Sequence, residues 1–168
     1  GREEEINTCI GCNQACLDHI FSRKIASCLV NPRACHESIY PFRRSKVAKR
    51  VAVVGGGPAG LSCAVTAAAR GHMVTLFEVQ NEIGGQFRLA RQIPGKDEFS
   101  ETLRYYRTQL QLHKVDVLLG CSPQPGDLID YDDIVISTGV TPREVVLPGA
   151  ENNNVSLYNE VLSGKKEI

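Results

Sequence analysis

The chain has 168 residues, a formal net charge of zero and 42% hydrophobic residues, which is typical of one globular domain with a small additional segment. The neutral charge gives no support for a nucleic-acid partner. Because the sequence has no run of about 18 apolar residues, it predicts no membrane-spanning helix and no membrane partner.

Seven cysteines are many for a chain of this size, and four of them lie in the first 28 residues, at Cys9, Cys12, Cys16 and Cys28. The spacing lets three thiolates bind one face of a compact metal group, which Cys28 completes. Disulfides are disfavoured because the glycine pattern at residues 55–60 indicates a nucleotide-binding fold, which normally works in a reducing cytosol. Ligation by four thiolates favours an iron–sulfur cluster, whereas structural zinc usually takes two separated Cys-x2-Cys pairs. Zinc and unligated thiols remain the alternatives.

Between the cysteines and the first strand, the chain carries polar and basic residues. Cys35 is expected to be a spare buried thiol and His36 a hydrogen-bonding loop histidine. The stretch 43–50 then carries five positive charges in eight residues. We interpret it as a solvated linker; electrostatic help for a phosphate-rich cofactor is the alternative.

The next feature is a short β-branched run at residues 50–54, followed by Gly55-x-Gly57-x-x-Gly60 and an alanine-rich stretch, 61–70. This pattern predicts a buried parallel strand, a tight turn and a helix whose first N–H groups face an anion. Gly55 allows the turn, Gly57 lets the backbone approach a pyrophosphate, and Gly60 allows close packing of helix and strand. The residues expected to bind phosphate are Gly55, Gly57, Pro58, Ala59 and Gly60.

A second predicted strand, Met73–Glu78, ends in an acid 18 residues after Gly60. A dinucleotide-binding fold needs a carboxylate there to accept the ribose hydroxyls. Glu78 would repel a 2′-phosphate, which favours FAD or NAD over NADP. The alternative is an ordinary βαβ unit with a solvated Glu78. Glu82, on the loop beyond, is expected to contribute little to binding.

The remaining elements are weaker signals. Phe99, Leu103, Tyr106 and Leu110 recur at helical spacing and predict an amphipathic helix over 99–112. We also expect a short strand at 115–119, a buried strand at 134–136 and a helix at about 157–164.

Two stretches make the sequence recognisable. Thr8–Asp18 and Cys28–Cys35 closely resemble the iron–sulfur segment of bacterial NADPH-dependent 2,4-dienoyl-CoA reductases, and trimethylamine dehydrogenase and related NADH:flavin oxidoreductases share a looser version. The order of the cysteines and the glycine pattern is also similar to that family's order. The resemblance covers essentially the whole chain, and the cysteine spacing is its most specific part.

The resemblance implies roles for individual residues. Cys9, Cys12, Cys16 and Cys28 would hold a 4Fe–4S cluster, and Cys35, Cys63 and Cys121 would not. The pair Gly84–Gly85 would lie beside FAD, although a plain turn is the alternative. Gln86 and Lys96 match positions that contact FAD, and Thr138 and Gly139 belong to a strand end that approaches it. The family also reads adenine near Ser122–Gln124, where Pro123 has no N–H to offer.

The resemblance implies an α/β fold, with a Rossmann-like FAD-binding domain on a parallel sheet after a small Cys-rich iron–sulfur segment. The expected parts are a cluster segment at 1–42, a basic linker at 43–49 and the FAD domain at 50–168, cut before an NADPH domain. In the cytoplasmic parent enzyme, electrons would pass from NADPH to FAD, to 4Fe–4S and to FMN in an N-terminal barrel. FMN would reduce the 2,4-dienoyl-CoA of unsaturated fatty acid β-oxidation. This chain alone is expected to be inactive.

Two alternatives from other classes remain. The parent is an amine dehydrogenase in which this domain binds only ADP as a structural element, or the chain is a non-catalytic zinc-bound module that docks a barrel. The bound nucleotide separates the first alternative from a reductase, and metal analysis separates the second.

Overall fold

The architecture is a four-stranded parallel sheet in a computed structural model that describes residues 1–143 and 146–166. The strands are β1 (Arg50–Val54), β2 (Met73–Glu78), β3 (Asp116–Leu119) and β4 (Asp133–Ile136). Their order is β3-β2-β1-β4, and each neighbouring pair runs parallel. The predicted α/β class with a parallel sheet is therefore confirmed.

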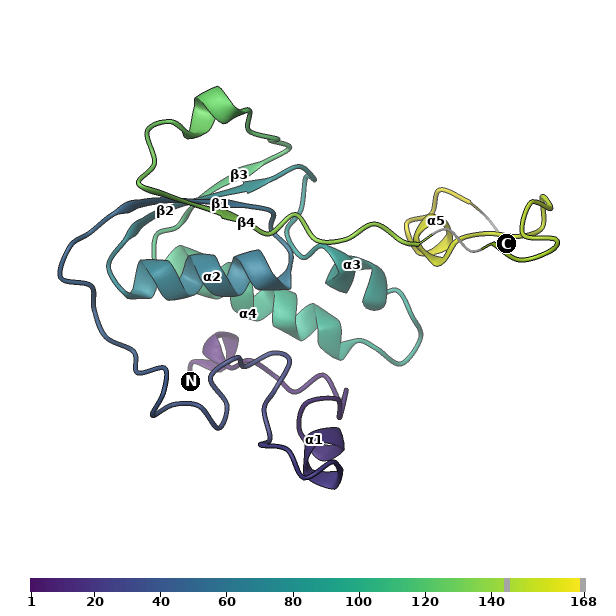
Figure 1. Ribbon diagram of the computed structural model, residues 1–168, viewed down its shortest axis with the longest axis horizontal. Coiled ribbons are helices and arrows are strands. Elements are labelled where there is room, and N and C mark those ends of the chain that lie inside the picture. Colours follow the sequence, from purple (N-terminus) through teal and green to yellow (C-terminus); the bar gives the residue numbers. More distant parts are fainter. Residues whose placement is uncertain (144–145, 167–168) are drawn as a thin grey trace.

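The helices that follow the predicted pattern cover one face of this sheet. Helix α2 (Pro58–Ala69) connects β1 to β2, and α4 (Glu98–Leu112) leads into β3; both lie below the sheet in Figure 1. The sequence predicted that four apolar residues of α4 face the core of the domain. Three of them, Leu103, Tyr106 and Leu110, are buried. The fourth, Phe99, is half-buried and packs edge-on against Phe87 with 4.8 Å between ring centroids.

The hydrophobic core lies between this helical layer and the sheet. Its buried members are Val51, Val53, Leu61, Ala64, Val65, Val74, Leu76, Ile83, Tyr106 and Leu110. Each fully buried leucine or valine contributes about 1.5–3 kcal/mol to the free energy of unfolding. This core holds the ends of β1 and β2, and therefore the loops that follow them, in fixed positions.

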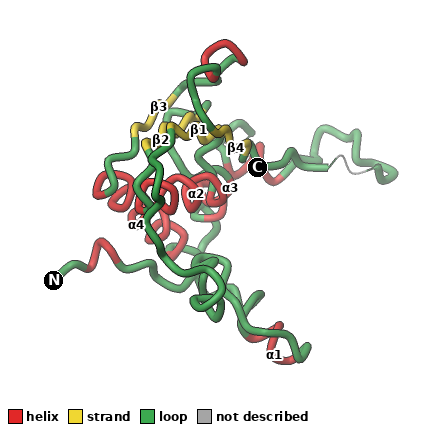
Figure 2. Tube along the Cα trace, turned by 60° about the vertical axis from the view of Figure 1, so that its left-hand side comes forward, coloured by secondary structure: helices red, strands yellow, loops and turns green. Residues whose placement is uncertain are grey.

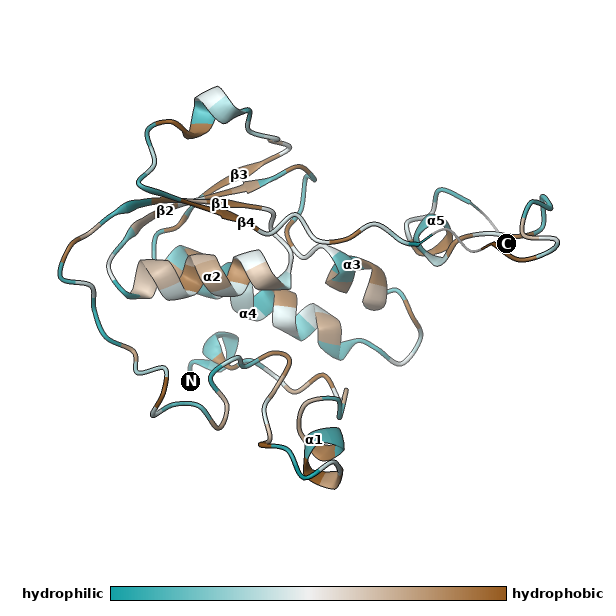
Figure 3. Cartoon of the chain, in the orientation of Figure 1, coloured by the Kyte–Doolittle hydropathy of each residue, from teal (hydrophilic) through white to brown (hydrophobic). Residues whose placement is uncertain are grey.

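The prediction that residues 134–136 form a buried strand is half right. The strand exists, but the side chains of Ile134 and Ile136 are 47% and 66% exposed. Strand β4 is at the edge of the sheet and pairs only with β1. Val135 between them packs against the core, so the two isoleucines lie on the opposite face of the strand, which no described helix covers (Figures 1 and 3).

The N-terminal 49 residues form mainly loops on the far side of the helical layer (Figures 1 and 2). They include the short helices η1 (Glu3–Glu5) and α1 (Leu17–Phe21). Arg104 on α4 holds this segment because its guanidinium donates to the carbonyl oxygens of Glu3 and Ile6, both at 3.2 Å. None of the described helices is long and apolar enough to cross a membrane.

Two further elements lie beside the sheet. Helix α3 (Gln86–Ala90) sits between β2 and α4 in sequence, and α5 (Tyr158–Leu162) lies on an arm that extends away from the sheet in both ribbon views. The short helix η2 (Pro125–Leu128) belongs to the connection between β3 and β4. The Tyr158 hydroxyl lies 3.4 Å from the Gln86 side-chain oxygen and links the arm to α3.

Candidate functional site

The turn between β1 and α2, residues 55–57, is the centre of the candidate site, and we call it the glycine loop. Gly55 has a φ of 109°, and a Cβ there would lie 2.3 Å from the carbonyl oxygen of Ser137. A Cβ on Gly60 would lie 1.9 Å from the carbonyl oxygen of Gly55. Both positions therefore require glycine, because a side chain would collide with backbone. The structure shows the tight turn and the close helix–strand packing that the spacing predicted.

The start of α2 faces this loop without a cap. Gly57 is the N-cap residue, Pro58 occupies the first turn, and no side chain caps the helix or places an acid in its first turn. The first N–H groups of a helix carry a partial positive charge and need acceptors. An uncapped helix start on a glycine loop is suited to bind a phosphate group.

Residues Gly84 and Gly85, which we call the second glycine loop, pack directly on the glycine loop. The N–H of Gly84 donates to the carbonyl oxygen of Gly56 at 2.8 Å. A Cβ on Gly85 would come within 3.0 Å of the Gly57 Cα. Both glycines have positive φ, at 124° and 49°. The pair is therefore packed against the glycine loop, beside the candidate site.

Glu78 ends β2 beside the glycine loop and is only 6% exposed. One carboxylate oxygen accepts the N–H of Gly56 at 2.7 Å, and the other accepts the N–H of Gln80 at 2.8 Å. The alternative of a solvated Glu78 is wrong. A carboxylate has about four acceptor positions, so two N–H bonds fix its orientation and leave capacity for two hydroxyl donors.

Two residues of the site were missed by the sequence analysis. Gly56 was treated as a free position in the pattern, yet a Cβ there would lie 2.8 Å from a Glu78 carboxylate oxygen. The Ser137 hydroxyl, at the end of β4, lies 3.0 and 2.9 Å from the carbonyl oxygens of Val54 and Gly55. Three consecutive glycines, Gly55, Gly56 and Gly57, were a signal that Gly56 also has a role. The position of Ser137 directly before Thr138 and Gly139, which the resemblance placed near FAD, gave only a weak signal for its role.

The remaining residues predicted to bind the nucleotide differ in how near they lie to the glycine loops. Gln86 follows the second glycine loop directly and is exposed. Thr138 and Gly139 continue from Ser137, so they leave the sheet beside the glycine loop. Lys96 is also exposed, but it lies on the connection between α3 and α4, with its ammonium group 5.9 Å from the centre of the Phe99 ring. None of the hydrogen bonds or ion pairs of the described residues joins Lys96 to the glycine loops.

The segment after β3 has few backbone N–H groups free to donate a hydrogen bond, and Pro123 has none. The N–H of Cys121 donates to the carbonyl oxygen of Glu78 at 2.9 Å, and the N–H of Gln124 donates to the Asp127 side chain at 2.8 Å. Among the described hydrogen bonds, the N–H of Ser122 has no acceptor. A base placed beside this segment would therefore find one free backbone donor, at Ser122.

The four cysteines predicted to bind a cluster are all free thiols, with Cys9 and Cys16 exposed and Cys12 and Cys28 half-buried. The N–H of Gly11 donates to the Cys9 sulfur at 3.4 Å. Gly11 and Asn13 have φ of 63° and 56°, so the chain turns tightly between the first three thiols. Hydrogen bonds to sulfur and turns of this kind fit an iron–sulfur ligand set. Within residues 1–143 and 146–166, however, no three metal-binding side chains converge on one point.

The expectation for Cys35 was wrong, because its thiol is exposed and its backbone is left-handed, with a φ of 63°. A sharp turn at this position directs the residue outward. His36 behaves as expected of a loop histidine, with its Nδ1 3.0 Å from the carbonyl oxygen of Ala34.

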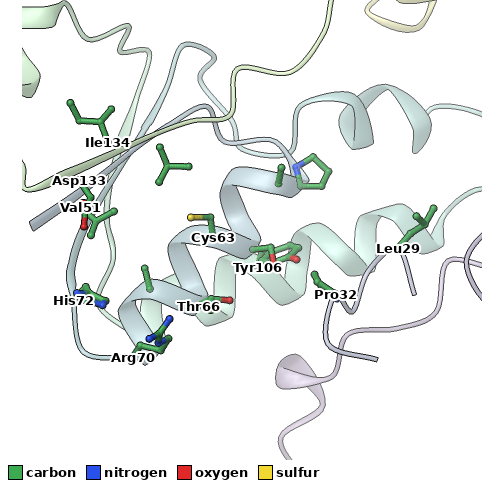
Figure 4. A pocket seen from close by; sticks show the side chains of 15 residues that line it. Leu29, Pro32, Val51, Cys63, Thr66, Arg70, His72, Tyr106, Asp133 and Ile134 are labelled. Atoms are coloured by element: carbon green, nitrogen blue, oxygen red, sulfur yellow. The ribbon is translucent and has the colours of Figure 1, made fainter. Parts of the chain in front are cut away.

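A hollow of about 880 Å³ separates the N-terminal segment from α2 and β4 (Figure 4). Cys63 and Thr66 line it from α2, and Leu29 and Pro32 line it from the N-terminal segment. Burial raises the pKa of the Cys63 thiol, which disfavours the reactive thiolate. None of the glycines of the candidate site lines this hollow. Of the residues expected to bind phosphate, only Pro58 and Ala59 line it.

Glu82, which the sequence placed on the loop beyond Glu78 and predicted to contribute little to binding, has three arginine partners. Its carboxylate accepts a hydrogen bond from Arg91 at 3.1 Å, pairs with Arg107 of α4, and lies 3.4 Å from the Arg88 Nε. These arginines come from α3 and its end and from α4, so one carboxylate joins both helices to the loop after β2. No spacing pattern in the sequence indicated this arrangement.

A glycine loop at the end of a parallel strand, an uncapped helix start and a buried acid on the neighbouring strand define a Rossmann-like domain of the FAD- or NAD-binding class. The model of the pyridine nucleotide-disulphide oxidoreductase family matches residues 49–166. The chain belongs to this family.

The chain is also similar to individual proteins of known activity. It is 36% identical over 171 residues to an NADH oxidase of Thermoanaerobacter brockii, a match that covers 98% of this chain and 26% of that protein. The structure of a 2-naphthoyl-CoA reductase in complex with 2-naphthoyl-CoA matches with a TM-score of 0.90 and 35% identity, covering 98% of this chain and 26% of the other. Histamine dehydrogenase from Rhizobium sp. 4-9 matches with a TM-score of 0.83 and 25% identity, with the same two coverages. The chain thus spans about a quarter of the length of these proteins.

Proposed function

We propose that the chain binds FAD through its ADP half. The buried carboxylate of Glu78 is the observation that carries this proposal, because its two N–H bonds hold it beside the glycine loop with acceptor capacity to spare. The ribose hydroxyls would donate to Glu78, and the pyrophosphate would rest on the N–H groups around residues 57–60. Gly85, Gln86, Thr138 and Gly139 would line the path toward the flavin, and Lys96 would reach it from the α3–α4 connection.

The acid also determines which nucleotide fits. A 2′-phosphate would place two negative charges beside a carboxylate that has no cation bonded to it in the described structure. Repulsion in a buried position is weakly screened. The site should therefore favour FAD, ADP or NAD over NADP.

The N-terminal segment is proposed to hold a 4Fe–4S cluster through Cys9, Cys12, Cys16 and Cys28. Support comes from the spacing, from the free thiols and from the N–H of Gly11 directed at the Cys9 sulfur. Such a cluster supplies one-electron transfer. This chain would orient the thiolates by the turns at Gly11 and Asn13. The proposed parts are therefore 1–42 for the cluster, 43–49 for the linker and 50–168 for FAD.

For the whole protein we propose an NADPH-dependent reductase of the 2,4-dienoyl-CoA reductase type. The similarity to 2-naphthoyl-CoA reductase supports it, because that structure holds an acyl-CoA with a conjugated ring next to the thioester. An FMN barrel, an NADPH domain and the fatty acyl-CoA site would then belong to the three quarters of the relatives' length that this chain does not span. A cytoplasmic location follows from this proposal.

A second candidate is supported by the match to histamine dehydrogenase. In an amine dehydrogenase of the kind considered from the sequence, this domain would bind ADP as a structural element. The same Glu78 and glycine loop would serve, since both nucleotides share the ADP group.

The experiment that tests these proposals is anaerobic purification followed by counting of iron, sulfide and extracted nucleotide. We expect four irons and four sulfides per chain after reconstitution, and FAD as the nucleotide that rebinds. Zinc without sulfide would overturn the cluster, and ADP bound in preference to FAD would favour the amine dehydrogenase.

A further inference from the structure

The second glycine loop has little freedom to move on its own. The Gly84 N–H is bonded to the carbonyl oxygen of Gly56, and a Cβ on Gly84 would lie 2.6 Å from a methyl of Leu103 and 3.0 Å from the Cγ of Arg88. The loop is therefore enclosed by the glycine loop on one side and by α3 and α4 on the other. A change in how α3 sits on α4 must shift it.

Glu82 is placed to control how α3 sits on α4. It precedes Gly84 by two residues, and Arg88 and Arg91 lie on α3 or at its end, while Arg107 lies on α4. Three guanidinium groups therefore surround one carboxylate, whose side chain is 31% exposed. Without its negative charge, the three partly exposed guanidinium groups would lose the partner that joins them, and α3 would be held less firmly on α4.

The carboxylate is charged at neutral pH. Burial by itself raises the pKa of Glu82, whereas the hydrogen bond from Arg91 and the positive charges around it lower the pKa. The net result is a pKa below the ordinary value of 4.5. The helices also have an apolar contact, the edge-on pair of Phe87 and Phe99. Loss of the charge should thus shift the helices without unfolding the chain.

We propose that Glu82 is a positioning residue for the nucleotide site, whose carboxylate fixes the second glycine loop against the glycine loop. It touches no nucleotide itself. The inference rests on the proposed function for its effect on nucleotide affinity, but its effect on the loop is independent of any ligand. It also runs against the expectation from the sequence that Glu82 contributes little to binding.

The test uses the full chain and the substitution Glu82→Gln, which keeps the shape and removes the charge. The first readout is hydrogen exchange of the Gly84 amide by NMR without nucleotide, where we expect faster exchange in the variant. The second readout is calorimetric titration with ADP, where we expect about tenfold weaker binding, because small displacements of binding groups cost this much.

Two control variants separate positioning from general stability. Glu101→Gln removes a similar ion pair on α4, between Glu101 and Arg104 at 2.8 Å, and should leave both readouts unchanged. Leu110→Ala opens the core away from the loop and should lower the free energy of unfolding by about 2–5 kcal/mol while ADP affinity stays within about twofold.

The outcomes distinguish this inference from the proposed function. Unchanged Gly84 exchange in Glu82→Gln overturns the inference whether or not nucleotide binds, and so does unchanged affinity in a chain that binds ADP. If the unsubstituted chain binds neither ADP nor FAD but Gly84 exchange still rises in the variant, the positioning role stands and the proposed function fails.

Discussion

The two proposed cofactor sites of this chain are formed in different ways. The glycine loop site consists mostly of backbone, and its parts fix one another: Gly60 packs on Gly55, Gly84 bonds to Gly56, and Glu78 accepts the N–H of Gly56. The cysteine segment consists of side chains on loops, and no three of the described ligands converge.

The difference has a physical reason. The glycine loop directly joins β1 to α2, both of which contribute to the hydrophobic core, so its backbone contacts form when the chain folds. Thiolates around a cluster repel one another and are drawn together by the metal, so binding and local folding are coupled. The comparison predicts that substitutions in the first site act on stability and affinity together, and that substitutions in the second act on metal content.

The largest effect is expected at the cysteines. Cys12→Ser should abolish iron binding at the proposed stoichiometry, because a cluster of this type needs all four thiolates. Metal analysis of the anaerobically reconstituted protein measures this. Cys63→Ser is the matched control, since that thiol lies on α2, and it should retain full iron. Iron retained in Cys12→Ser would remove Cys12 from the ligand set.

The next largest effect is expected at Gly60. Gly60→Ala places a methyl group 1.9 Å from a carbonyl oxygen, and the backbone must move. We expect a loss of about 3 kcal/mol in the free energy of unfolding and no measurable nucleotide binding. Denaturant titration checks it, with Gly126→Ala as control because nothing lies within 4 Å of a Cβ there. Equal stability of the two variants would contradict the packing described here.

A smaller effect is expected at Glu78. A hydrogen bond to a charged group contributes about 1.5–3 kcal/mol, so Glu78→Ala should weaken FAD or ADP binding about ten- to a hundredfold. Titration calorimetry measures it. Glu37→Ala, on the exposed N-terminal segment, is the control; Glu82→Ala would be unsuitable, since Glu82 has three arginine partners. An affinity unaltered by Glu78→Ala would remove the ribose role.

The smallest effect is expected at Ser137. Ser137→Ala removes a hydroxyl that donates to the Val54 and Gly55 carbonyl oxygens. The Val54 oxygen still accepts the N–H of Ser137, whereas the Gly55 oxygen has no other donor among the described hydrogen bonds. We expect a loss of about 1 kcal/mol in the free energy of unfolding and little change in ADP affinity. A loss above about 3 kcal/mol would show that the hydroxyl, and not the backbone, holds the glycine loop to β4.

The sequence predicted the strand–turn–helix, the second strand and the long helix because each has a local signal: β-branched runs, the glycine spacing and a helical period. It placed Glu78 correctly at the strand end. It could not show that Ile134 and Ile136 are exposed, because burial of a strand depends on which neighbours it has in the sheet. It also missed the partners of Glu82, since Arg88, Arg91 and Arg107 are brought together only by the packing of α3 on α4.

The central claim is that the glycine loop and Glu78 form a site for an ADP-containing nucleotide without a 2′-phosphate. Titration calorimetry of this chain with ADP, FAD and NADP tests it most directly. The proposed site predicts that ADP and FAD bind and that NADP binds more weakly than either, because Glu78 is proposed to accept the ribose hydroxyls and would repel a 2′-phosphate. Tightest binding by NADP would contradict the assignment of this site.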